Sequence, residues 1–100
     1  MSQDASLKQS DLKICIPRIE SNISNEYIFK IFSKLRIGII QKITDVPLRS
    51  DSDYKRVFIK IKWDRQTPNG GFIYNRLNSG ETVKVVYETP WYWKIMASKI

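Results

Sequence analysis

The chain has 100 residues, of which 42% are hydrophobic and 12% aromatic, and this is enough for one domain with a single modest core. Seventeen lysines and arginines against ten acidic residues give a net charge of +7, which attracts phosphate or acidic lipid headgroups and repels basic partners. Without histidine and with a single cysteine, the sequence excludes Ser–His–Asp and Cys–His catalysis, a Cys/His zinc site and an intramolecular disulfide. We therefore expect a non-catalytic protein with no cofactor and no metal.

The N-terminal segment shows no sign of membrane targeting. The first eleven residues are polar, and the longest uninterrupted apolar runs in the chain are three or four residues. The unpaired Cys15 suits a reducing compartment. These features predict a soluble, intracellular monomer with no membrane partner, and a disordered tail over residues 1–10.

The first predicted strand covers residues 12–16. Leu12, Ile14 and Ile16 alternate with Lys13 and Cys15, as expected for a half-buried strand. Pro17 should end this strand, because proline cannot donate a hydrogen bond to a neighbouring strand.

A helix is predicted to begin at Ser24, which can cap it, with Glu26 in its first turn. Its apolar residues are spaced for one buried face: Ile28, Ile31, Phe32 and Leu35. This helix should end before Gly38, and a second strand should follow over residues 39–46.

The clearest strand pattern covers residues 54–63. One predicted face is apolar and contains Val57, Ile59, Ile61 and Trp63. The opposite face is basic with one aromatic ring and contains Arg56, Phe58, Lys60 and Lys62. Because alternate residues of a strand point to opposite sides, we expect the first set in the core and the second on an open surface.

A second helix is predicted from Thr67, a capping residue, to Gly80. Gly70 and Gly71 weaken this prediction, since each glycine costs roughly 1 kcal/mol relative to alanine inside a helix. A last strand follows over residues 81–88. Pro90 then separates a C-terminal aromatic extension, residues 89–100, from the predicted domain at residues 11–88.

The order strand, helix, strand, strand, helix, strand predicts an α+β fold of the split-βαβ, ferredoxin-like type. Its four-stranded antiparallel sheet would carry both helices on one face, because each helix must bury a single apolar stripe. The other face would be open. Pro90 should turn the extension away from the last strand, so that Trp91 and Trp93 anchor at the sheet edge or across its open face and Tyr92 stays accessible.

The chain resembles the RNA recognition motif (RRM) family over roughly residues 11–88. The short motif of that family aligns with ICIPRI at residues 14–19, and the long motif with YKRVFIKI at residues 54–61. In the family, the exposed aromatics of these motifs stack on bases. The corresponding positions here hold Cys15, Arg56 and Phe58, and the usual glycine of the long motif is Lys55. The resemblance implies the fold and single-stranded RNA binding, with one of three stacking rings present.

A narrower similarity concerns residues 54–59, 85–87 and 90–94. These segments resemble small RRM-like proteins encoded by large DNA viruses of protists and algae. The resemblance implies a viral protein located in a host cell or a virion.

Single-strand-binding proteins combine cations for the nucleic-acid backbone with rings that stack on bases. The predicted nucleic-acid-binding residues are Lys13, Cys15, Arg56, Phe58, Lys60, Lys62, Lys84, Trp91 and Trp93. Their expected ligand is single-stranded RNA or another single-stranded nucleic acid. Two alternatives remain: the charges serve only solubility, or a degenerate RRM fold binds a protein partner.

Overall fold

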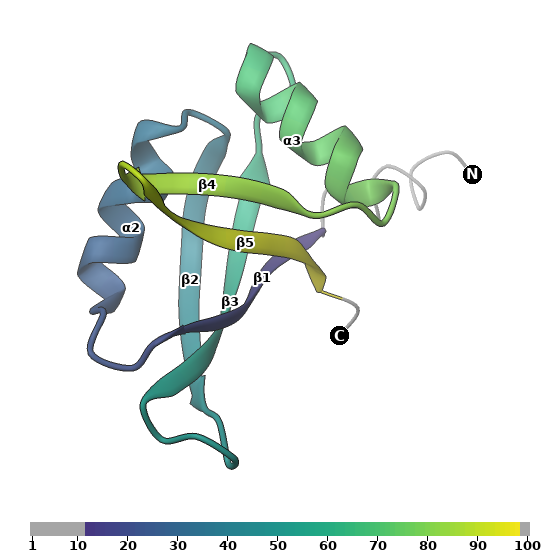
Figure 1. Ribbon diagram of the computed structural model, residues 1–100. Coiled ribbons are helices and arrows are strands. Elements are labelled where there is room, and N and C mark those ends of the chain that lie inside the picture. Colours follow the sequence, from purple (N-terminus) through teal and green to yellow (C-terminus); the bar gives the residue numbers. More distant parts are fainter. Residues whose placement is uncertain (1–11, 99–100) are drawn as a thin grey trace.

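The computed structural model describes residues 12–98, so the predicted tail at residues 1–10 lies outside the described residues. Two helices and a five-stranded antiparallel sheet form an α+β fold, the class that the sequence predicts (Figure 1). The elements are β1 (Lys13–Glu20), α2 (Asn25–Lys34), β2 (Gly38–Pro47), β3 (Tyr54–Trp63), α3 (Pro68–Asn78), β4 (Val83–Glu88) and β5 (Trp91–Ser98). Neither helix is long and apolar enough to cross a bilayer.

The sheet has one more strand than predicted, and its order is β2-β3-β1-β5-β4. The segment expected to be an aromatic extension supplies β5, which pairs with β1 on one side and β4 on the other. Thr89 and Pro90 form the two-residue turn between β4 and β5, where the missing N–H of proline removes no hydrogen bond of the ladder. The prediction that Pro90 turns the chain away from β4 is therefore wrong.

The insertion of β5 also separates β4 from β1, so β4 forms an edge of the sheet. Burial explains this choice. In β5 both Trp93 and Ile95 are buried, whereas in β4 only Val85 is. Apolar surface removed from water stabilises the fold, so the strand with the larger buried side chains takes the inner position.

The core lies on the helix-facing side of the sheet, where Val57, Ile59 and Ile61 are buried as predicted. Figure 1 shows the β4–β5 hairpin crossing in front of β2 and β3, with α2 and α3 at either side. Trp93 joins these parts: its ring stacks on Phe32 of α2, with ring centroids 6.2 Å apart and planes 5° from parallel. The sheet is thus curled around one core.

Both helices begin where the sequence predicts. The Ser24 hydroxyl accepts a hydrogen bond from the Tyr27 N–H at 3.1 Å, and the Thr67 hydroxyl accepts one from the Gly70 N–H at 2.9 Å. Gly70 is buried, and a Cβ atom there would collide with the carbonyl oxygen of Asp64. The glycine that weakened the helix prediction is therefore what lets α3 pack against the loop before it.

Candidate nucleic-acid interface

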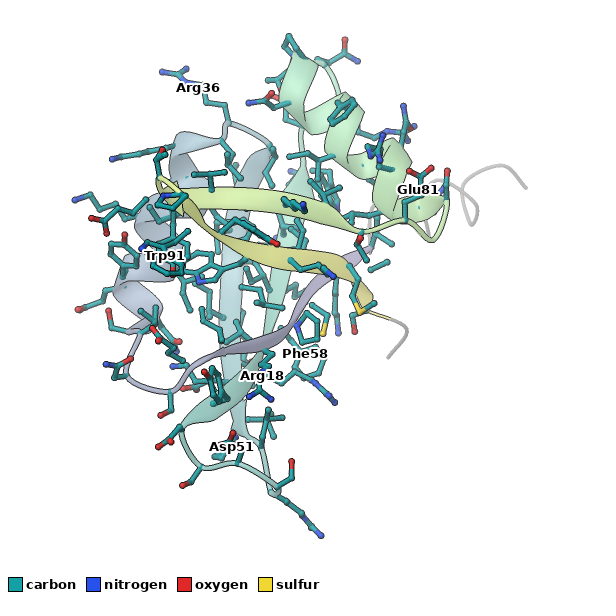
Figure 2. All side chains as sticks on the ribbon, viewed as in Figure 1. Arg18, Arg36, Asp51, Phe58, Glu81 and Trp91 are labelled. Atoms are coloured by element: carbon teal, nitrogen blue, oxygen red, sulfur yellow. The ribbon has the colours of Figure 1, made fainter. Side chains whose placement is uncertain are left out.

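The sheet surface opposite the helix-facing side is here called the outer face. Residues that pair directly across neighbouring antiparallel strands lie on the same face. The strand register therefore places one row of side chains across β2, β3, β1 and β5: Thr44, Phe58, Cys15 and Met96. Phe58 lies near the middle of this row, and Figure 2 shows it beside β1, away from both helices.

The outer face carries a set of basic residues, here called the basic face: Lys13, Lys42, Arg56, Lys60, Lys62, Lys84 and Lys94. None of them forms an ion pair with a carboxylate of residues 12–98. The described carboxylates lie on α2, in loops and turns, at strand ends or, for Asp45, on the helix-facing side: Glu20, Glu26, Asp45, Asp51, Asp53, Asp64, Glu81 and Glu88. Seven cations without an ion-pair partner among residues 12–98 thus share one side of the sheet.

Sequence reasoning missed Lys42 and Lys94. A bulge between Ile40 and Lys42 shifts the register of β2 and brings Lys42 opposite Lys60. Lys94 belongs to a segment that was placed outside the sheet. Its position between Trp93 and Ile95 was the available signal, because that alternation is typical of a strand with one buried side.

A second ring, Tyr92, lies on the outer face with 45% of its surface exposed. It pairs with Val86, and the Nζ atom of Lys84 lies 4.9 Å from its ring centroid. Its accessibility was expected, because in an extended segment Tyr92 points to the side opposite the two tryptophans. Tyr92 therefore adds an aromatic surface that the predicted set of binding residues lacks.

The two tryptophans do not lie on the outer face, although both were predicted to contact the ligand there. Trp93 is anchored as expected, but it is 4% exposed and points into the core, so it cannot reach a ligand. Trp91 was expected to anchor and is instead 64% exposed, at the start of β5. Alternation puts Trp91 and Trp93 on the same side of the strand, opposite Tyr92.

Cys15 lies in the row with Phe58, yet it is only 7% exposed. Burial raises the pKa of its thiol above the ordinary value, and the nearby positive charge of Arg56 partly opposes this shift. The thiol thus stays protonated at neutral pH and has little nucleophilic character. Its place between Phe58 and Met96 indicates a packing role beneath the surface.

Lys55, although part of β3, is excluded from the basic face because it points to the helix side. Its ammonium group donates hydrogen bonds to the Ile23 carbonyl oxygen at 2.7 Å and to the Asp45 carboxylate at 3.1 Å. The hydrogen bond from Lys55 lowers the pKa of Asp45 below its ordinary value. This buried cation fastens β2 and β3 to the loop before α2.

The sequence matches no protein-family model and none of the curated proteins, and the structure matches no solved structure. Among residues 12–98, no group of three or more histidine, cysteine, aspartate or glutamate side chains could hold a metal ion. The arrangement of the outer face itself is therefore the basis for a functional assignment.

Proposed function

We propose that the protein binds single-stranded RNA, or single-stranded DNA, through the outer face of its sheet. The observation that carries this proposal is the basic face, which lies around Phe58 and Tyr92 and whose members form no ion pair with a described carboxylate. Lysine and arginine neutralise phosphates, and the release of condensed counterions drives binding. Aromatic rings hold unpaired bases by stacking, which favours a single strand over a duplex.

The rows of side chains on the sheet support a defined path for the bound nucleic acid. The row that contains Phe58 crosses four strands and spans roughly 14 Å, given the usual strand spacing. The next row on one side of Phe58 lies two residues further along each strand and consists of Lys42, Lys60 and Lys13. Arg56 lies on the other side of Phe58. A base stacked on Phe58 would thus have cations on both sides for the flanking phosphates.

The resemblance to the RNA recognition motif supports the same proposal. The two segments that resemble its motifs lie side by side in β1 and β3, with Cys15 opposite Phe58. We propose that the fold is an RRM-like split-βαβ arrangement in which β5 takes the place of the last strand and β4 is an addition at the edge. This reading leaves the RRM-like surface on β1 and β3 open.

A protein partner is the second candidate, and exposed apolar residues favour it. Ile39 and Val86 lie on the outer face, on β2 and β4, and both are more than half exposed. Apolar side chains in such positions often mark docking surfaces. Binding through these residues would depend little on salt, whereas nucleic-acid binding must weaken steeply as salt rises.

The test is a fluorescence anisotropy titration of a labelled mixed-sequence single strand at several salt concentrations. We expect saturable binding whose logarithmic affinity falls linearly with the logarithm of salt concentration. Lys60→Ala should reduce that slope by about 0.7, the contribution of one phosphate contact on a single strand. Lys30→Ala, which removes an exposed charge from α2, is the matched control. Equal effects of the two variants, or no saturable binding, would contradict the proposal.

A further inference from the structure

A hollow of about 580 Å³ lies where the end of β1, the start of α2 and the β4–β5 turn come together. Its walls include the rings of Tyr27, Tyr87 and Trp91, the side chain of Ile23, and the carboxylates of Glu20 and Glu88. These residues come from four elements, β1, α2, β4 and β5, and from the loop before α2, so only the tertiary fold assembles them. The hollow shares no residue with the basic face.

The aromatic walls are held by the core. Tyr27 and Tyr87 meet edge to face, with ring centroids 6.3 Å apart and planes at 85°. Tyr87 also stacks on the buried Trp93, with centroids 4.4 Å apart. Trp91 has most of its surface exposed and makes no ring contact with another described residue. The hollow thus combines two supported rings with one accessible ring.

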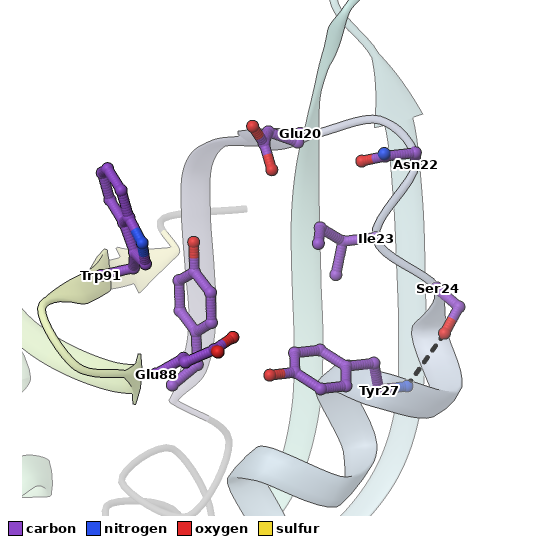
Figure 3. A pocket seen from close by; sticks show the side chains of 8 residues that line it. Glu20, Asn22, Ile23, Ser24, Tyr27, Glu88 and Trp91 are labelled. Carbon is purple, nitrogen blue, oxygen red and sulfur yellow. Dashed lines mark hydrogen bonds between the residues drawn. The ribbon is translucent and has the colours of Figure 1, made fainter.

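The two carboxylates give the hollow a negative potential, although the whole protein carries a net charge of +7. In Figure 3 the carboxylates of Glu20 and Glu88 point toward the space that the lining residues surround. Neither carboxylate forms an ion pair with a lysine or arginine of residues 12–98. Burial raises the pKa of the Tyr87 hydroxyl, and the charge of Glu20, the adjacent Tyr27 and the charge of Glu88 raise it further.

Elsewhere the chain places its own cations over its rings. The pairs, with the distance from the cation to the ring centroid, are Arg18 and Tyr54 (3.8 Å), Arg65 and Tyr74 (4.2 Å), Arg76 and Phe72 (5.3 Å), and Lys84 and Tyr92 (4.9 Å). Within residues 12–98, the rings of Tyr27, Tyr87 and Trp91 have no such cation. The hollow therefore offers rings and carboxylates to a cation from another molecule.

We propose that this hollow binds a methylated ammonium group, such as the head of choline or the side-chain end of trimethyllysine. The face of an aromatic ring attracts cations, and rings around a quaternary ammonium are a recurrent way of recognising it. The quaternary ammonium of choline or trimethyllysine has no N–H groups that need hydrogen-bond partners, so it suits walls made mainly of rings. Glu20 and Glu88 supply the compensating charge that a protein with net charge +7 needs to attract a cation. This site is independent of the proposed nucleic-acid binding.

The test compares choline with 3,3-dimethylbutan-1-ol, its uncharged analogue of the same shape, by NMR titration of the full-length protein at constant ionic strength. Choline should shift the backbone amides of residues 20–27, 87–89 and 91 saturably. It should bind at least about five-fold more tightly than the alcohol, as expected for one cation–π contact of about 1 kcal/mol. Equal affinity for the two compounds, or shifts that do not saturate at these residues, would overturn the proposal.

Matched variants locate the binding. Trp91→Ala and the double variant Glu20→Gln, Glu88→Gln should each weaken choline binding about five-fold or more. Tyr92→Ala, on the opposite side of β5, and Glu26→Gln, in α2, should leave it unchanged. If Trp91→Ala lowers the melting temperature, its effect on choline binding is ambiguous. The double glutamine variant then tests the site, because it changes only exposed carboxylates. Undiminished binding in the double variant would overturn the site.

A parallel titration with Nα-acetyl-trimethyllysine amide distinguishes the sources of the methylated ammonium. Tighter binding of this probe than of choline would indicate a modified protein as the natural partner. Tighter binding of choline would indicate a small molecule or a lipid headgroup. Either result supports the proposed chemistry, whereas failure of both probes to bind contradicts it and leaves the nucleic-acid proposal unaffected.

Discussion

Trp91 and Tyr92 follow each other in β5 and lie on opposite sides of the sheet, each with a large exposed surface. Tyr92 belongs to the outer face, and Trp91 borders the hollow beside α2. Substitutions of these two adjacent residues therefore test two separate surfaces. Because neither is part of the buried core, replacing either one should leave the fold intact.

For nucleic-acid binding we expect Tyr92→Ala to cost about 1–3 kcal/mol, since one base would lose its stacking partner. Trp91→Ala should leave the affinity for the single strand unchanged. The measurement is the anisotropy titration at fixed salt, with circular dichroism to establish that both variants are folded. A larger loss of affinity in Trp91→Ala than in Tyr92→Ala would show that the nucleic acid binds on the side of Trp91, which contradicts the outer-face proposal.

Phe58 is the second ring to test. Phe58→Ala should also cost about 1–3 kcal/mol of binding free energy. Phe72→Ala is the control, because Phe72 is an exposed ring on α3, away from the outer face. Arg56 lies next to Phe58 and can stack its guanidinium on a base. If the folded double variant Phe58→Ala, Arg56→Ala binds as tightly as the wild-type protein, the outer-face proposal fails.

Trp93 and Trp91 should differ sharply in their effect on stability. Trp93→Ala removes a buried ring that stacks on Phe32 and Tyr87, and we expect a loss of about 3–5 kcal/mol in the free energy of unfolding. Trp91→Ala should change it by no more than about 0.5 kcal/mol. Urea denaturation measures both values. Truncation after Pro90 removes all of β5 and should prevent folding, and a stable truncated protein would contradict the central position of this strand.

The Asp45–Lys55 ion pair predicts a pH dependence of stability. The pKa of Asp45 is lower in the folded protein than in the unfolded chain, so this carboxylate stabilises the fold above its ordinary pKa, near 4. The contribution should disappear as the pH falls from about 4 through the lower folded pKa. Asp45→Asn should cost about 1–3 kcal/mol at neutral pH, because the buried ammonium of Lys55 loses a partner.

The measurement for this ion pair is the urea midpoint between pH 2 and pH 7. Asp53→Asn is the control, since Asp53 lies in the exposed β2–β3 turn and forms no ion pair with another described residue. The same decline in acid for Asp45→Asn and the wild-type protein would show that other carboxylates cause it.

Gly70→Ala should destabilise the protein although alanine favours a helix by about 1 kcal/mol. The added Cβ would collide with the Asp64 carbonyl oxygen, so α3 would have to move away from the preceding loop. At Gly71 the corresponding atom would lie 3.1 Å from the Arg65 carbonyl oxygen, which needs only a small adjustment. In thermal denaturation, Gly70→Ala should therefore melt at a lower temperature than Gly71→Ala. The reverse order would contradict the packing argument.

Local patterns in the sequence determined much of this structure. The caps at Ser24 and Thr67 depend on hydrogen bonds within three residues, so both helix starts could be predicted. Alternation in β3 was sufficient to separate Val57 from Phe58, because successive side chains of a strand point to opposite faces whatever its neighbours are.

Only the tertiary structure decided which strands are neighbours, and therefore which residues share a surface. The position of β5 depends on how much apolar surface Trp93 and Ile95 bury against elements far away in sequence. A local sequence pattern does not reveal this buried area. The same pairing brings Lys94 to the outer face, and a bulge in β2 adds Lys42. The hollow that Trp91 borders is likewise a product of long-range packing. Composition determined the net positive charge of the protein, whereas strand register determined which of its cations share the outer face.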